Sequence, residues 1–133
     1  MKKDANQTLS FTLSKSERLK SKKTIDSLFS KGKSIFLYPF RIKYLPASEF
    51  NIHKNQFMVT VPKRLFKRAV DRNLLKRRIR EAYRLNKPLY LSENESGDFL
   101  LIAYIYVAKE IHDFDLIQSK LIESLKRLKK DSK

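Results

Sequence analysis

The segment DRNLLKRRIREAYR, residues 71–84, carries six Lys or Arg residues and only two acidic ones within an apolar helical repeat. Side chains three and four positions apart share a face of an α-helix. One face holds the apolar members and one amide, namely Leu75, Ile79, Ala82, Tyr83 and Asn86. The adjoining flank, here called the basic stripe, holds Asn73, Lys76, Arg77, Arg80 and Arg84, while Arg78 and Glu81 lie elsewhere. The segment therefore predicts an amphipathic helix with a core face and a cationic flank.

The basic stripe is either a solvated helix face or a surface that binds an anion. Soluble helices usually mix charges and gain about 0.2–0.5 kcal/mol for each ion pair one turn apart. The stripe contains no acidic residue, and residues 63–87 contain eleven basic residues against two acidic ones. We therefore favour the anion-binding interpretation, extended upstream by Lys63, Arg64, Lys67 and Arg68.

The helix itself is expected from Arg72 to Asn86. Asp71 is a good N-cap, because its carboxylate accepts hydrogen bonds from the first turn, and Pro88 disfavours helical geometry at the residue before it. The free N–H groups near Arg72 and Asn73 offer a further site for a phosphate. The amide of Asn73 either hydrogen-bonds a ribose, a phosphate or a base edge, or helps to cap the first turn.

The whole chain shares the positive charge of this segment. Its 133 residues are the size of one domain, and 30 Lys and Arg against 14 Asp and Glu give a net charge of +16. Such an excess destabilises a compact state unless a polyanion neutralises it. A nucleic acid is the favoured partner, and an anionic membrane surface is the alternative. The lack of a long amphipathic anchor helix argues against the membrane.

Several classes of protein do not fit the sequence. Without cysteine there are no disulfides and no cysteine-ligated zinc. The N-terminus has no apolar region of the kind that secretory signals contain. The longest apolar run, residues 99–108, is shorter than the roughly 20 residues of a membrane-spanning helix. We expect a cytoplasmic protein.

Residues suited to catalysis are sparse. The two histidines, His53 and His112, are far apart in sequence, and the chain has only two glycines, Gly32 and Gly97. Two glycines so far apart in the sequence can form neither the GxGxxG loop nor the Walker loop that binds phosphate. Asp113 and Asp115 flank an expected helix start, where capping explains them. We expect no self-contained active site and no cofactor bound by the protein alone.

The segments before residue 63 predict one helix and two strands. Ile25, Leu28 and Phe29 have helical spacing, and Gly32 stands where a helix ends, so a helix is expected at residues 22–30. Residues 35–45 predict a strand, with Phe40, Ile42 and Tyr44 on one face and Arg41 and Lys43 on the other. Residues 56–62 predict a second strand, with Phe57, Val59 and Val61 on one face. The loop between the two strands suggests an antiparallel pair.

The remaining segments complete an α/β sandwich. Residues 98–109 are apolar without alternation, which is typical of a central strand covered on both faces. A last helix is expected at residues 114–128, with Asp113 as its N-cap. Residues 1–15 predict a flexible basic tail, and residues 16–130 a single domain in which one small sheet packs against helices.

The motif at the centre of this domain resembles a known family. RNLLKRRIRE, residues 72–81, fits the pattern RN-x-x-KR-x-x-R and is similar to the basic helix of the protein subunit of bacterial ribonuclease P. ERLKSKKTIDSLFSKGK, FRIKYL, FMVTVPKRLFKRAV and DFLLIAYIYVAK resemble further parts of that family, and the resemblance covers residues 17–130.

The resemblance implies a fold and an activity. The fold is a small mixed sheet with helices, like the second domain of ribosomal protein S5, with a left-handed βαβ crossover where pattern alone favours a right-handed one. The activity is removal of the 5′ leader of precursor tRNA by a ribonucleoprotein endonuclease, in which the RNA subunit is the catalyst and uses Mg²⁺. The protein implied is a monomer when free, one per catalytic RNA, with no membrane contact.

The resemblance also assigns residues to the two RNA partners. Those expected to contact the catalytic RNA are Lys63, Arg64, Lys67, Arg68, Arg72, Asn73, Lys76, Arg77, Arg80 and Arg84. Those expected in a cleft for the precursor tRNA leader, between the first helix and the sheet, are Lys20, Ile25, Phe29, Arg41 and Lys43.

Three positions depart from the family pattern. Leu74 stands where an arginine is common, and Arg78, one turn on, is a possible replacement. Ile25 and Lys43 stand where aromatic residues are common.

Two other functions remain as alternatives to the one that the resemblance implies. They are a structural RNA-binding protein of the ribosomal type and a DNA-binding protein, although no turn-linked helix pair supports the latter.

Overall fold

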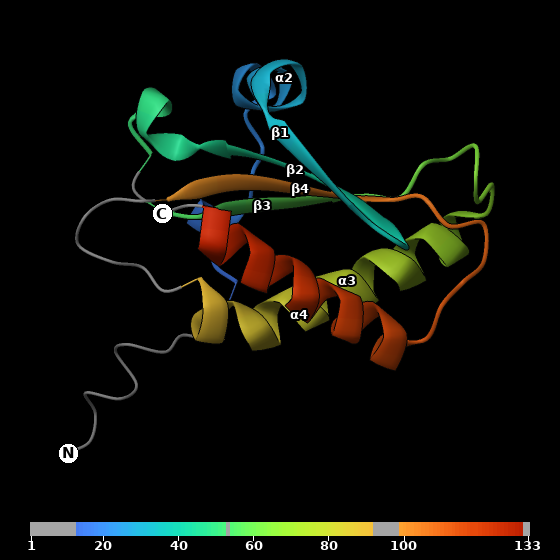
Figure 1. The fold of residues 1–133 in the computed structure, drawn as a ribbon. Helices are drawn as coiled ribbons and strands as arrows, with labels where there is room; N and C mark the ends of the chain where they lie inside the picture. The colour runs from blue at the N-terminus through green and yellow to red at the C-terminus, as the bar shows by residue number, and fades with distance from the viewer. Residues whose placement is uncertain (1–12, 53, 92–98, 132–133) are drawn as a thin grey trace.

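A four-stranded mixed sheet forms the middle layer of the molecule (Figure 1). The computed structural model describes residues 13–52, 54–91 and 99–131, and the strand order is β1-β2-β4-β3. The strands are β1 (Lys33–Leu37), β2 (Phe40–Pro46), β3 (Gln56–Thr60) and β4 (Leu100–Tyr106). α3 (Ala69–Tyr90) and α4 (Phe114–Asp131) cover one face, and α2 (Lys22–Lys31) lies over part of the other. The α/β sandwich prediction is confirmed.

The larger core lies between the sheet and the pair α3 and α4. Apolar side chains of alternate sheet positions, including Phe40, Ile42 and Tyr104, pack there against Leu75 and Ile79 of α3. A smaller core on the opposite face brings α2 against β2 and β4. β4 is buried on both faces except at Ile105, which is half-buried, so its unbroken apolar sequence predicts its central place correctly.

The expected pairing of the two early strands is wrong. β2 pairs antiparallel with β1 and with β4, and β3 pairs in parallel with β4. The most apolar strand, β4, thereby has a neighbour on each side, which leaves the less apolar β1 and β3 at the sheet edges. The connection from β3 through α3 to β4 is a βαβ unit, and its left-handedness stays a prediction.

The single strand expected at residues 35–45 is in fact a hairpin. β1 and β2 meet at a turn of Tyr38 and Pro39, whose peptide bond is cis. Proline has no N–H to donate to a ladder, so residue 39 interrupts the strand. Phe40, Ile42 and Tyr44 do point into the larger core, while Arg41 and Lys43 lie on the other face, as predicted.

Helix α3 is longer than its sequence signals suggest. It begins at Ala69, with Arg68 as N-cap and Asp71 in its first turn, and it continues through Pro88 to Tyr90. Proline lacks one intrahelical hydrogen bond, a loss that falls here in the last turn. The ammonium of Lys87 in that turn forms a buried ion pair with Glu17, and the Leu91 amide donates to the Lys87 carbonyl at 2.7 Å. Tertiary contacts thus hold the helix beyond the expected end.

The other two helices start and end close to the predicted positions. Ser21 caps α2 by accepting from the Thr24 amide at 3.4 Å, and Gly32 follows its last residue. Asp113 caps α4 by accepting from the Leu116 amide at 3.0 Å, so its predicted capping role is confirmed. Within the described ranges, no helix is both long and apolar enough to cross a bilayer.

The segment before α2 runs along the free edge of β3. Its 3-10 turn η1 (Lys15–Glu17) is followed by a parallel bridge between Arg18 and Phe57. Leu13 packs against the larger core. The flexible tail predicted for residues 1–15 lies mostly outside the described residues, as does His53.

Candidate RNA-binding surface

The basic loop that precedes α3, residues 63–68, is anchored at one apolar residue. Phe66 is buried and its ring lies 5.9 Å from that of Tyr106, measured between centroids. The amides of Leu65 and Phe66 donate to the Pro62 carbonyl, which closes the turn. Lys63, Arg64, Lys67 and Arg68 are all exposed. An inward-pointing phenylalanine therefore directs four cations outward.

Arg72 ties this loop to the helix. Its guanidinium donates to the carbonyls of Phe66 and Lys67, each at 2.8 Å. α3 starts one turn before the expected position, so its free N–H groups lie near Arg68 and Val70 rather than near Arg72. Arg72 is first of all a residue that positions the loop, and its RNA contact stays a prediction.

The basic stripe keeps the face that the helical projection predicts. Leu75, Ile79, Ala82, Tyr83 and Asn86 are buried, as the projection predicts for the opposite side. Asn73, Arg77 and Arg80 are exposed and Lys76 is half-buried. Asn73 lies in the second turn, and no hydrogen bond of its amide is found in the described part of the chain. The capping alternative for Asn73 is therefore wrong.

Arg84 is the exception within the basic stripe. Its guanidinium contacts both carboxylate oxygens of Glu81, at 3.1 and 2.6 Å. The hydrogen bonds from Arg84 hold the pKa of Glu81 below its usual range. The projection places these two residues apart, but a long arginine reaches back across one turn. The stripe contains no acidic residue, as predicted, but Glu81 beside it neutralises its C-terminal end.

Arg78 is engaged with the protein backbone, and its replacement of the arginine missing at position 74 stays a prediction. It donates to the backbone carbonyl of His112 at 2.6 Å, on the side of α3 that faces the loop before α4.

His112 lies beside Tyr38, whose hydroxyl also donates to Glu110 at 3.0 Å. Among the residues described, no three or more of His, Cys, Asp and Glu gather as a metal site would require.

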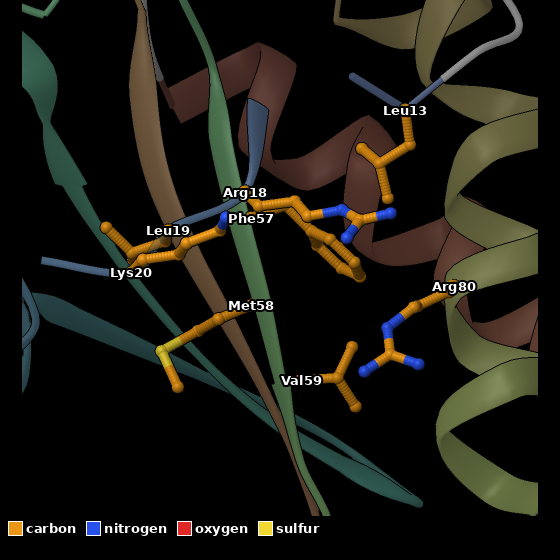
Figure 2. A pocket seen from close by; sticks show the side chains of 8 residues that line it. All are labelled: Leu13, Arg18, Leu19, Lys20, Phe57, Met58, Val59 and Arg80. Carbon is orange, nitrogen blue, oxygen red and sulfur yellow. The ribbon is translucent and has the colours of Figure 1, made fainter. Parts of the chain in front are cut away.

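A pocket of about 230 Å³ continues the basic stripe toward the edge of β3 (Figure 2). Arg80 enters it from α3, and Arg18 and Lys20 enter it from the segment beside β3. Its apolar lining comes from Leu13, Leu19, Phe57, Met58 and Val59. The pocket therefore joins the cations of α3 to Lys20 on the other side of β3.

The Glu17–Lys87 pair fixes the segment that carries Arg18. Each side chain is only 8% exposed. Burial raises the pKa of Glu17, but the Lys87 ammonium and hydrogen bonds from Ser14 outweigh it and hold the pKa below its usual range. The placement of Arg18 and Lys20 thus depends on an ion pair that the sequence pattern does not reveal.

The sheet face that carries α2 is only partly covered, and we call its uncovered part the open face. Lys43 donates to the Phe29 carbonyl at the end of α2, at 3.1 Å, so its ammonium holds α2 to the sheet. Phe29 turns out of the core and is 36% exposed. Ile25 packs partly into the smaller core, and Arg41 is exposed.

The sequence and this geometry match a known protein family. A model of the Ribonuclease P family matches residues 13–129. A ribonuclease P protein component from Porphyromonas gingivalis strain W83 is 40% identical over 89% of this chain and 87% of its own length. The chain belongs to the ribonuclease P protein family.

Other members of the family agree in sequence and fold. The ribonuclease P protein component of Thermotoga maritima is 33% identical over 91% of this chain and 97% of its own. The solved ribonuclease P protein of that organism covers 84% of this chain and 96% of its own at 27% identity, with a TM-score of 0.67. The solved structure of a Staphylococcus aureus RNase P protein mutant with defective mRNA degradation activity covers 86% of this chain and 90% of its own. The two chains are 27% identical, and the TM-score is 0.71. The α+β fold is thus that of known ribonuclease P proteins.

The predicted site residues fall into two surfaces of this member of the family. The cations assigned to the catalytic RNA lie together on the basic loop and α3. Those assigned to the leader lie around α2 and the open face, with Lys20 at the pocket. Sequence reasoning did not single out Arg18, which lines the pocket, or Phe36, an exposed aromatic residue of β1 that pairs with Arg41 on the open face. Arg18 has no pattern to mark it, whereas Phe36 was visible as an aromatic residue of a predicted strand.

Proposed function

We propose that this chain is the protein subunit of a ribonuclease P ribonucleoprotein and binds its catalytic RNA through the basic loop and basic stripe. The observation that supports this proposal most directly is a set of six cations without an acidic partner in the described ranges, namely Lys63, Arg64, Lys67, Lys76, Arg77 and Arg80. An RNA backbone supplies the missing negative charge, since phosphate contacts dominate affinity for nucleic acids.

The same proposal assigns the open face and α2 to the 5′ leader of precursor tRNA. Its candidate contacts are Lys20, Ile25, Phe29, Arg41 and Lys43. Of these, Lys20 and Arg41 are exposed cations, whereas the ammonium of Lys43 is engaged at the end of α2. Single strands are bound by cations that follow the backbone and by aromatic rings that stack on bases. The open face offers both.

In this proposal the protein positions RNA and the RNA subunit performs the cleavage with Mg²⁺. The protein acts in the cytoplasm as a monomer, one per catalytic RNA, and does not contact a membrane. Binding of the leader far from the scissile bond adds affinity and orientation, which lowers the concentration of Mg²⁺ needed.

The alternative function is that of a structural RNA-binding protein of the ribosomal type, which would have the same positive net charge and the same α/β sandwich fold. The two are distinguished by the RNA that co-purifies with the tagged chain from its own cells. We expect the catalytic RNA of ribonuclease P in amounts equal to the protein, and its loss in a variant with Arg77 and Arg80 replaced by Ala. Recovery of ribosomal RNA in place of the catalytic RNA contradicts the proposal.

A further inference from the structure

One row of side chains crosses all four strands on the open face. Phe36 pairs with Arg41, Arg41 with Ile105, and Ile105 with Thr60. Residues directly opposite one another in neighbouring strands point to the same face. The row therefore runs from the free edge of β1 to the end of β3, a span of about 14 Å at the usual distance between strands.

This row lies beyond the cover of α2. The adjacent row contains Lys43, Ala103 and Met58; Lys43 bonds to the end of α2, and the other two pack in the smaller core. In the uncovered row, by contrast, Phe36 is 58% exposed, Arg41 is exposed, and Ile105 and Thr60 are half-buried. Thr60 is followed after two residues by Lys63 of the basic loop.

Phe36 has no structural role that accounts for its ring. Its neighbours in β1, Ile35 and Leu37, point into the larger core, whereas Phe36 points the opposite way. No ring contact of Phe36 is found among the described aromatic residues. A large exposed apolar ring beside an exposed arginine is the combination that single-stranded nucleic acids use, because the ring stacks on a base while the cation meets a phosphate.

We propose that Phe36 is a base-stacking residue for the 5′ leader, and that the leader crosses the sheet along the row Phe36, Arg41, Ile105 and Thr60 toward the basic loop. This inference rests on the proposed function and adds a residue and a path to it. Arg41 binds a leader phosphate, and Ile105 supplies an apolar floor between the two edges. Because every base has a flat face, the contact tolerates any leader sequence.

The test uses the ribonucleoprotein reconstituted from catalytic RNA and this protein, with two precursor tRNAs that differ only in leader length. One carries an eight-nucleotide leader with 2-aminopurine at successive positions, and the other a single-nucleotide leader. Phe36→Ala, Phe36→Leu and Phe36→Trp are compared with the wild type. Ile111→Ala is the matched control, since Ile111 is 41% exposed and lies outside the row.

Phe36→Ala is expected to weaken binding of the long-leader substrate by roughly fivefold to a hundredfold, the range expected for the removal of one base–aromatic stack. Stacking of an aromatic ring on 2-aminopurine quenches the fluorescence of that base. Phe36→Trp should therefore keep both the affinity and the quenching at one leader position, and Phe36→Leu should lose both. The short-leader substrate and the Ile111→Ala control should be unaffected.

Two results overturn the stacking role while the proposed function stands. In the first, the wild-type protein strengthens long-leader binding and Phe36→Ala does so equally well. In the second, Phe36→Ala weakens both substrates alike, or Phe36→Leu matches Phe36→Trp. If the wild-type protein itself has no effect on either substrate, the proposed function fails, and this inference fails with it.

Discussion

Single residues of the basic stripe differ in how free they are to meet RNA. Arg77 and Arg80 have no acidic partner in the described part of the chain, whereas Arg84 is held by Glu81 and Arg72 by the loop carbonyls. The sequence predicts the face correctly because burial follows the helical period. It does not predict these side-chain contacts, which depend on where a long guanidinium reaches.

Replacing Arg77 with Ala should weaken binding to the catalytic RNA. Removing a cation that meets one phosphate lowers the magnitude of the slope of log affinity against log salt concentration by about 1. Titrations of the RNA at four or more salt concentrations measure this slope. Arg127→Ala on α4, a half-exposed arginine that pairs with Glu123, is the matched control. Equal slopes for the wild type and Arg77→Ala would show that Arg77 belongs to a solvated helix face and does not contact the RNA.

The Glu17–Lys87 pair makes stability depend on acid pH. The folded-state pKa of Glu17 lies below its usual range, so the pair stabilises the protein at neutral pH. That stability is lost as the pH falls from about 4 through the lowered pKa.

Glu17→Gln should cost about 3 kcal/mol of unfolding free energy at pH 7, because it leaves the Lys87 ammonium buried without its partner. The acid dependence below about pH 4 should become shallower. Urea unfolding from pH 3 to pH 7 measures both effects. Glu123→Gln, which removes an exposed partner of Arg127, should change stability by less than about 0.5 kcal/mol. A similar loss for both variants would contradict the stabilising role of the buried pair.

At the scale of elements, the sequence predicts type and order better than pairing. Alternation identifies the two faces of β2, and the apolar run of residues 99–108 identifies β4 as a central strand. The parallel partnership of β3 with β4 is not encoded locally, since it depends on which strand has most surface to bury. Pro39 and Pro88 are likewise ambiguous signals: the first divides a strand, and the second is accommodated in the last turn of α3.

The junction of α2 with the sheet depends on Gly32. A Cβ on this residue would lie 2.4 Å from the Leu28 carbonyl oxygen and 3.0 Å from that of Tyr44, both backbone atoms. Gly32→Ala should therefore push the end of α2 away from β2 and cost about 1–3 kcal/mol, the usual range for overpacking. Chemical denaturation measures this loss.

The same substitution should affect the two proposed RNA-binding surfaces unequally. The contact of Lys43 with the Phe29 carbonyl lies at this junction, so leader binding should weaken, while binding of the catalytic RNA by α3 should not change. Ser30→Ala is the matched control, because Ser30 is an exposed residue of the same helix. Equal stability of Gly32→Ala and Ser30→Ala would show that α2 does not pack as closely as the structure indicates.

For the whole molecule, charge and topology point to the same arrangement. The net charge of +16 is concentrated on the loop and helix that connect β3 with β4, and the open face lies on the other side of the sheet. The pocket that Arg18, Lys20 and Arg80 line joins these two surfaces around the edge of β3. The sequence predicts both surfaces through the motif and its resemblance. Their connection emerges only in three dimensions, because residues 13–20 and α3 are far apart in the chain.

The central claim is that the protein assists an RNA catalyst rather than cleaving RNA itself. The most direct test measures cleavage of a precursor tRNA at low Mg²⁺ by the catalytic RNA alone, by the protein alone and by the two together. We predict a single cut at the mature 5′ end, faster and at lower Mg²⁺ with the protein than without it, and no cleavage by the protein alone. Cleavage of the precursor by the protein alone, or no effect on the catalytic RNA at physiological salt, would contradict the account.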